Sequence, residues 1–170
     1  MKTKHVLITG LSGTGKTYLS KYFIKRGKKA FDADEEIGRW IDKNGNIARK
    51  MMKNANQKWL SKYDWQWSKK LLNNILRKNK EVYLFGASDN MYDFLDLFDK
   101  KYYLKADKKL LAKRLRNRKN PYDFAKTEEQ KQIVFSWIEY AQNKAKENRL
   151  EFIDASLTPK QIFDIIVNAN

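Results

Sequence analysis

Residues 10–17 read Gly-Leu-Ser-Gly-Thr-Gly-Lys-Thr, and this octapeptide constrains the fold more than any other stretch of the chain. Two glycines separated by four residues precede a Lys and a Thr, which is the pattern of a phosphate-binding loop. An apolar run, residues 5–9, comes directly before the loop, and apolar residues at helical spacing follow it from Tyr18 to Phe23. A strand, a glycine-rich loop and a helix in this order predict a polyphosphate site.

The composition of this loop suits a nucleotide and its metal ion. Glycines let the backbone approach an anion, and successive N–H groups then converge at the positive end of the following helix. We expect Lys16 to reach the β- and γ-phosphates of ATP and the Thr17 hydroxyl to ligate the bridging Mg²⁺. A glycine-rich turn that ends in Lys-Thr by chance is the alternative, and the flanking strand and helix weigh against it. The loop residues expected to bind the nucleotide are Gly10, Leu11, Ser12, Gly13, Thr14, Gly15, Lys16 and Thr17.

The size and composition of the chain exclude several classes of protein. Its 170 residues suffice for one well-formed core and are too few for two ordinary domains. Hydrophobic residues make up 42% and aromatic residues 14%, as in globular proteins. Because there is no Cys and a single His, disulfides, thiol catalysis, Cys-ligated zinc and multi-histidine metal sites are excluded.

The N-terminus and the charge bear on location and partners. Residues 1–4 run straight into the first predicted strand, and no stretch approaches the roughly 18 apolar residues of a membrane helix, so we expect a cytoplasmic protein without a membrane partner. The 36 basic and 20 acidic residues give a net charge of +16, which can mark a nucleic-acid partner. Most basic residues are Lys spread along the whole chain, which favours general surface composition instead. Monomer and homodimer both remain open.

A pair of carboxylates follows the second predicted strand, which includes residues 28–31. Asp32 and Asp34 stand at positions i and i+2, and on an extended segment both would face one cavity beside the phosphate loop. One could orient Mg²⁺ through its water shell while the other accepts a proton or hydrogen bond from an acceptor hydroxyl. The competing interpretation is that either Asp caps a helix that begins near Glu35.

The phosphate loop, the Asp-x-Asp and an Arg-rich segment late in the chain together resemble the P-loop small-molecule and nucleotide kinases, among them the shikimate kinases and nucleoside monophosphate kinases. The resemblance spans nearly the whole chain and is specific at the phosphate loop. It implies that Asp34 binds acceptor hydroxyls and that Asp32 binds metal-bound water. The chain departs from shikimate kinases at residues 86–90, which read Gly-Ala-Ser-Asp-Asn in place of a glycine triplet. Shikimate is therefore not the favoured acceptor.

Residues 35–70 correspond to the segment where such kinases place an acceptor-binding insertion. The segment interleaves aromatic residues with Lys and Arg, which suits a base or sugar stacked beside a phosphate. Trp40 and Trp59 fit the lining of an acceptor pocket and ordinary packing equally well. Trp67 stands at helical spacing with later Leu and Ile residues, which predicts a core position on a helix.

An Arg-rich helix is predicted from a cap at Asp107 to Lys119. Arg114 and Arg118, at i and i+4, would share one face of it. In the resembling kinases a lid begins here, and its arginines clamp the nucleotide and stabilise charge on the transferring phosphoryl group. The lid would span residues 114–128. A solvated basic helix face is the alternative.

Local signals predict the remaining strands. Residues 81–86 read as the third, central strand, 101–105 as the fourth and 151–154 as the last. In the resembling kinases a backbone loop folds around adenine after the last strand, a place that Ala155 occupies here.

Capping residues mark the remaining helices. Asp89 is expected to cap a short helix, Thr127 opens a capping box and a long helix to about Asn148, and Thr158 opens a second capping box.

Together these features predict one domain over residues 1–170, with a three-layer α/β fold of the P-loop kinase kind, a five-stranded parallel sheet and a short lid. The expected activity is ATP- and Mg²⁺-dependent phosphoryl transfer to a small acceptor, with a nucleoside or nucleotide preferred. Alternatives are a polynucleotide 5′-hydroxyl kinase, a shikimate-type small-molecule kinase and a non-catalytic nucleotide-binding module. The residues expected to act in catalysis by positioning and charge are Lys16, Asp32, Asp34, Arg114 and Arg118.

Overall fold

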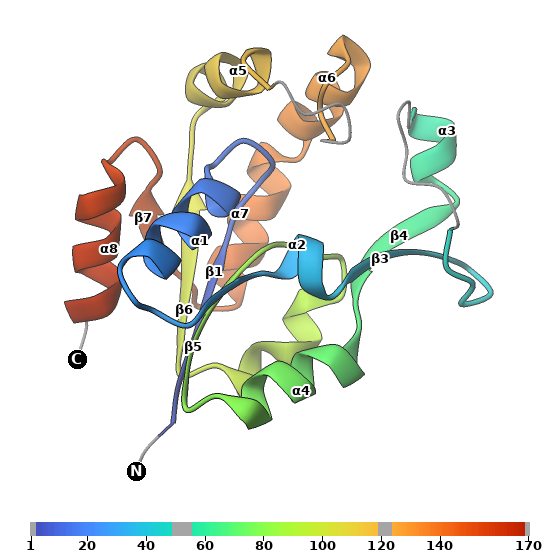
Figure 1. Ribbon diagram of the computed structural model, residues 1–170. Helices are drawn as coiled ribbons and strands as arrows, with labels where there is room; N and C mark the ends of the chain where they lie inside the picture. Colours follow the sequence, from blue (N-terminus) through green and yellow to red (C-terminus); the bar gives the residue numbers. More distant parts are fainter. Residues whose placement is uncertain (1–2, 49–55, 119–123, 169–170) are drawn as a thin grey trace.

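The computed structural model of the protein describes residues 3–48, 56–118 and 124–168. At its centre lies a parallel sheet of five strands with helices against both faces (Figure 1), which confirms the predicted three-layer α/β fold. In their order across the sheet, the strands are β2 (Ala30–Asp32), β5 (Glu81–Phe85), β1 (Lys4–Thr9), β6 (Lys100–Lys105) and β7 (Glu151–Asp154).

Strand β1 occupies the middle of the sheet and leads directly into the glycine-rich loop. Ile8, near its end, pairs with Phe85 of β5 on one side and with Tyr102 of β6 on the other. The prediction that residues 81–86 form the central strand is wrong, because β5 lies between β1 and the edge strand β2. Strand order depends on long-range pairing, which the apolar runs of a sequence do not encode.

Alternate side chains along each strand face opposite sides of the sheet and build two cores. In β1, Val6 and Ile8 belong to one core and Leu7 to the other, and all three are fully buried. Burial on both faces explains why this strand is a continuous apolar run. The first core is covered by α1 (Lys16–Lys25) and α8 (Pro159–Asn168), and the second by α4 (Lys69–Lys78), the 3₁₀ helix η1 (Met91–Leu97) and α7 (Ile138–Glu147).

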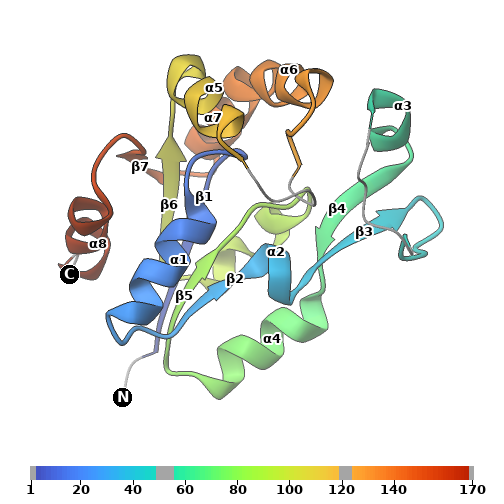
Figure 2. The same ribbon diagram turned by 45° about the horizontal axis from the view of Figure 1, so that its top comes forward.

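An antiparallel hairpin projects from the edge of the sheet (Figure 2). Its first strand follows a short helix, and its connection carries another; the four elements are α2 (Ala33–Glu36), β3 (Gly38–Asp42), α3 (Gln57–Leu60) and β4 (Tyr63–Trp67). Trp67 is buried in the core as predicted, but it ends β4 instead of lying on a helix. Residues 49–55 of the predicted acceptor-binding insertion lie outside the described residues.

Several helices differ from their predicted extents. Helix α5 (Lys108–Arg116) is capped by Asp107 as predicted but ends before residue 118. The long helix predicted after Thr127 is two helices, because α6 (Glu128–Ser136) ends before Trp137 and α7 follows it. No Gly or Pro marks that break. Both capping boxes are present, and no helix in the described ranges is long and apolar enough to cross a membrane.

Replacing Phe23 by Ala is expected to lower the free energy of unfolding by about 3–5 kcal/mol. The Phe23 ring is fully buried on α1, with its centroid 5.0 Å from that of Phe85 and 4.7 Å from that of Phe163. Tyr18→Ala on the same helix is the control, because Tyr18 is 65% exposed and its loss should change stability by about 0.5 kcal/mol or less. Urea denaturation measures both variants, and equal stabilities would contradict the assigned core.

Candidate active site

Three glycines give the loop between β1 and α1 its shape. Gly10, Gly13 and Gly15 have φ angles of 151°, 94° and 101°, a backbone region that side chains disfavour. A Cβ at Gly10 would stand 2.8 Å from the carbonyl oxygen of Leu104, and one at Gly13 would stand 3.1 Å from the Leu115 side chain. Conformation therefore favours glycine at all three positions, and space also limits the side chain at Gly10 and Gly13.

The loop ends at the start of α1 with backbone N–H groups that no side chain caps. Gly15 is the N-cap residue, its position makes no side-chain cap hydrogen bond, and the first turn contains no acidic residue. An uncapped, positively polarised helix start is suited to an anion. Thr17, in the first turn, is exposed and is not tied into the core.

Lys16 is buried, and its ammonium group lies inside the curve of the loop. Its Nζ donates to the carbonyl oxygens of Gly10 at 2.7 Å and of Leu11 at 3.2 Å. Burial lowers the pKa of Lys16, an effect that attraction to Asp34 and Asp32 opposes and that Arg118 reinforces. The loop thus holds a positive charge facing the acidic residues that follow β2.

The two acidic residues occupy different structural settings. Asp32 caps α2, and one of its carboxylate oxygens accepts from the Asp34 backbone N–H at 3.0 Å. The expected extended arrangement is wrong, because α2 begins at Ala33, so Asp34 lies in a helical turn and not on an extended segment; the helix also starts earlier than Glu35. Both carboxylates nevertheless interact electrostatically with Lys16.

Asp34 is held from three sides. Its Oδ1 accepts from the indole Nε1 of Trp65 at 3.2 Å, the backbone of Ala87 also hydrogen-bonds its carboxylate, and Lys16 attracts it. Burial raises the pKa of Asp34 above its usual value, and these three contacts lower it only in part. A carboxylate with a raised pKa is a better proton acceptor than an ordinary surface Asp.

The end of β5 makes room for this arrangement. A Cβ at Gly86 would stand 2.6 Å from the Cβ of Ala33 and 3.3 Å from Oδ1 of Asp34. The next residues hold the hairpin, since Oδ2 of Asp89 accepts from the backbone N–H of Trp65 at 2.7 Å. The prediction that Asp89 caps the following helix is wrong, because η1 has no side-chain cap.

The residues present fit a magnesium ion held through few protein atoms. Oδ2 of Asp32 is buried without a hydrogen-bond partner, and a carboxylate oxygen in this state can accept a cation or its water. Thr17, the last residue of the loop of residues 10–17, offers an exposed hydroxyl. In the described part of the chain, no cluster of three or more His, Cys, Asp or Glu could hold a metal by itself. Mg²⁺ in phosphate sites commonly relies on one or two carboxylates plus the phosphates.

The two arginines are placed beside the loop but differ in their surroundings. Arg114 donates from Nη1 to the carbonyl oxygen of Thr14 and from Nη2 to that of Ala155, both at 2.8 Å. Arg118 lies beyond the end of α5, so the expected pair on one helix face is wrong, and its Nη1 donates to the carbonyl oxygen of Phe124. Arg114 thus joins the phosphate loop to the loop after β7. Residues 119–123 of the predicted lid lie outside the described residues.

The hairpin has an aromatic cluster of its own. Trp40 lies with its ring centroid 4.9 Å from that of Trp59 and 5.1 Å from that of Trp65, while Trp59 stacks on Tyr63 at 4.2 Å. All four rings are partly exposed, and they pack in neither core of the sheet. Sequence reasoning noticed these aromatic residues but missed the bond from Trp65 to Asp34, for which the sequence carries no local signal.

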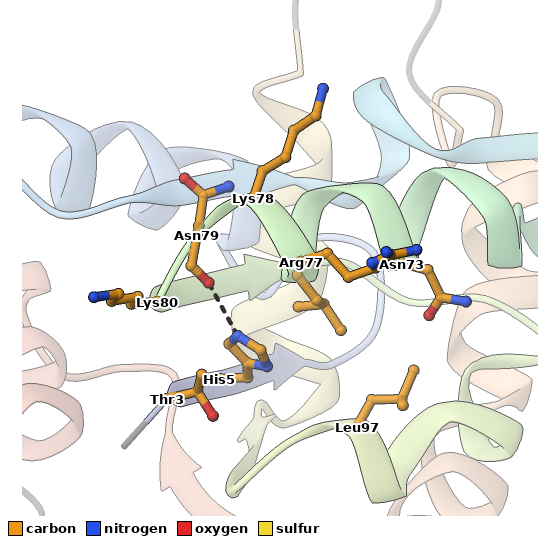
Figure 3. Close-up of a pocket in the computed structure, with 9 residues that line it drawn as sticks. Thr3, His5, Asn73, Arg77, Lys78, Asn79, Lys80 and Leu97 are labelled. Atoms are coloured by element: carbon orange, nitrogen blue, oxygen red, sulfur yellow. Dashed lines mark hydrogen bonds between the residues drawn. The ribbon is translucent and has the colours of Figure 1, made fainter. Parts of the chain in front are cut away.

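A separate hollow of about 470 Å³ lies at the amino ends of the strands, where β1 and β5 begin (Figure 3). Its lining includes His5, whose Nε2 lies 3.2 Å from the carbonyl oxygen of Asn79, and Arg77 and Lys78 from the last turn of α4. Cations at a helix C-terminus are favourable without any ligand. Active sites in parallel sheets lie at the carboxyl ends of the strands, so the loop of residues 10–17 marks the better candidate.

Two comparisons concern proteins of similar sequence. A family model described as an AAA domain matches residues 6–135. No curated protein matches the chain.

Solved structures of kinases share the fold. A shikimate kinase from Acinetobacter baumannii, in complex with shikimate, is 16% identical with a TM-score of 0.61, covering 99% of this chain and 94% of that one. A deoxyadenosine kinase from M. mycoides with bound dATP is 16% identical with a TM-score of 0.55, covering 96% and 97%. A gluconokinase from Sinorhizobium meliloti 1021 is 13% identical with a TM-score of 0.52, covering 94% and 87%. The resemblance to P-loop kinases is thereby confirmed at the level of the fold.

Gly13→Ala is expected to destabilise the protein more than Gly27→Ala. Both glycines have left-handed φ angles, 94° and 78°, so both variants carry a backbone penalty of about 1–2 kcal/mol. Only the Cβ at position 13 would also press on Leu115, at 3.1 Å, whereas nothing lies within 4 Å at position 27. Thermal or urea unfolding of both variants measures the difference, and equal losses would contradict the tight seating of the loop.

Proposed function

Because the chain belongs to the AAA domain family, we propose that it binds ATP in the loop of residues 10–17 and transfers the γ-phosphoryl group to a hydroxyl of a small acceptor. The observation that carries this proposal is the electrostatic attraction between the side chains of Lys16 and Asp34. One is a buried cation inside the phosphate loop, and the other is a half-buried carboxylate attracted to it. A phosphoryl group needs a cation on its oxygens, and an acceptor hydroxyl needs a proton acceptor, on facing sides.

The donor side of the reaction rests on the loop. Lys16 exchanges its bonds to the carbonyl oxygens of Gly10 and Leu11 for the phosphate oxygens, a small movement for a flexible side chain. The uncapped N–H groups at the start of α1 add their partial positive charge. Positioned charge of this kind provides most of the catalysis in phosphoryl transfer.

Thr17 and Asp32 would hold Mg²⁺, Thr17 by its hydroxyl and Asp32 through water on its unpartnered oxygen. When bound, the ion neutralises charge on the phosphates. The division of labour between the acids follows from their partners. Asp32 is fixed by its cap bond to α2, whereas Asp34 faces Lys16 and accepts the proton of the acceptor hydroxyl.

Arg114 and Arg118 contribute on the lid side. Arg114 fixes the loop after β7 through the carbonyl oxygen of Ala155, which places that loop for the adenine ring. Arg118 interacts electrostatically with Lys16, so its guanidinium lies close enough to add positive potential at the phosphates. In this scheme residues 1–170 act as one unit, residues 35–70 bind the acceptor and residues 114–128 form the lid.

The acceptor we favour is a nucleoside or nucleotide. Trp40, Trp59 and Tyr63 are partly exposed on the hairpin, and aromatic rings of this kind suit a stacked base. The structural relatives include a deoxyadenosine kinase, a sugar kinase and a shikimate kinase, so the fold itself is compatible with several acceptors.

The activity is tested by ADP release from ATP with Mg²⁺ across nucleosides, nucleoside monophosphates, shikimate and a 5′-hydroxyl oligonucleotide. One acceptor class should raise turnover. Lys16→Ala should reduce this turnover about a hundredfold or more, because the cation that binds the phosphate oxygens is lost. Asp34→Asn should reduce kcat by a similar factor. Lys21→Ala and Asp96→Asn, at exposed positions on α1 and η1, are the matched controls. Turnover that survives in Lys16→Ala would contradict the proposal.

Asp32→Asn is expected to raise the Mg²⁺ concentration for half-maximal turnover roughly tenfold, because a neutral amide holds metal-bound water less well than a carboxylate. Titration of Mg²⁺ at fixed, saturating ATP measures the effect, with Asp96→Asn as control. An unchanged Mg²⁺ dependence would remove Asp32 from the metal site.

A further inference from the structure

Trp65 connects the aromatic hairpin to Asp34, the proposed proton acceptor. Its indole Nε1 donates to Oδ1 of Asp34 at 3.2 Å, across 31 positions of the chain. An indole N–H can only donate, and a buried one usually has an acceptor. We propose that Trp65 is a positioning residue, which holds the Asp34 carboxylate in line for the acceptor hydroxyl and couples it to the hairpin. This inference rests on the proposed phosphoryl transfer to that hydroxyl.

The backbone of Trp65 is clamped on both sides by one residue. Oδ2 of Asp89 accepts from the Trp65 N–H at 2.7 Å, and the Asp89 N–H donates to the Trp65 carbonyl oxygen at 2.8 Å. Asp89 follows β5, the strand that separates β1 from β2. The position of Trp65 is therefore fixed by the segment after β5 as well as by the hairpin.

The ring of Trp65 is fixed by close packing. A Cβ at Gly38 would stand 2.2 Å from Cζ2 of Trp65, so the indole lies directly on the backbone of β3. Trp40, its cross-strand partner, also packs against it, with ring centroids 5.1 Å apart. A ring confined in this way has little freedom, and it can hold a carboxylate oxygen in one direction.

Packing alone does not account for a tryptophan here. Trp67, two residues later on β4, has a buried indole nitrogen without a hydrogen-bond partner, so at that position the ring contributes packing and no hydrogen bond. At position 65 the nitrogen faces Asp34 instead. The atoms that lie on Gly38, Cε2, Cζ2 and Cη2, belong to the outer ring of the indole. Trp65→Phe therefore keeps an aromatic ring at this position but removes the donor together with these contacts, and the Asp34 variants isolate the hydrogen bond itself.

The first experiment measures the hydrogen bond without any assay of activity. The protein has five Trp residues, so its ¹⁵N spectrum holds five indole N–H resonances, and loss of one in Trp65→Phe assigns it. In Asp34→Ala this resonance should move and exchange faster with water. Asp64→Ala, which removes an exposed carboxylate next to Trp65, should leave it nearly in place. If Asp34→Ala lowers stability, Asp34→Leu, which likewise offers no hydrogen-bond acceptor, is read in the same way. A resonance that moves no more than in Asp64→Ala overturns the proposal.

The second experiment separates positioning from simple binding. With the acceptor identified in the turnover assay, Trp65→Phe should lower kcat roughly tenfold or more while the KM values for ATP and acceptor change little. Trp137→Phe, at the junction of α6 and α7, controls for the exchange of Trp by Phe and should keep wild-type kcat. An unchanged kcat, or a rise in acceptor KM alone, overturns the positioning role.

The two experiments also distinguish this inference from the proposed function. If the wild-type protein transfers phosphate and Trp65→Phe behaves as wild type, only the role of Trp65 is wrong. If the wild type transfers phosphate to nothing, the proposed reaction fails and the positioning role fails with it, even where the resonance confirms the bond.

Discussion

The electrostatic attraction between Lys16 and Asp34 is the interaction on which the rest of the site depends. Burial disfavours both charges, lowering the pKa of Lys16 and raising that of Asp34, and each partner opposes the change in the other. Hydrogen bonds also hold each group, from Lys16 to the carbonyl oxygens of Gly10 and Leu11 and from Trp65 to Asp34. A phosphoryl group arriving between them would meet a cation already desolvated on one side and a proton acceptor on the other, so little reorganisation would remain for the reaction.

The topology of the sheet explains how two residues far apart in the chain come to face each other. Lys16 follows β1 and Asp34 follows β2, and β5 runs between these strands. Any side chain at the end of β5 would fill the space, yet that position is Gly86, where a Cβ would stand 2.6 Å from Ala33. The missing side chain lets α2 and its acid approach the loop. A single glycine directly after a third strand thus leaves the space that α2 occupies.

Much of the fold could be predicted because its signals are local. The strand–loop–helix unit, the caps at Asp107 and Thr127 and the five strands follow from short-range patterns and are present. Some errors concern long-range relations, since the central place of β1 and the bond from Trp65 to Asp34 depend on neighbours distant in sequence. Others concern where a helix begins or ends, as at Ala33, Arg116 and Trp137. Composition pointed to an aromatic insertion, but only the pairing of β3 with β4 decides which tryptophan reaches the acids. The roles assigned to the site residues stay predictions.

The most direct measurement is a crystal structure with a non-hydrolysable ATP analogue and Mg²⁺. We expect the phosphates to lie within the loop of residues 10–17, with Nζ of Lys16 released from the carbonyl oxygen of Gly10, which it contacts at 2.7 Å without ligand. Asp34 should face the γ-phosphate position while keeping its bond to Trp65. A nucleotide bound elsewhere, or a Lys16 still bonded to Gly10 with the loop empty, would contradict the account.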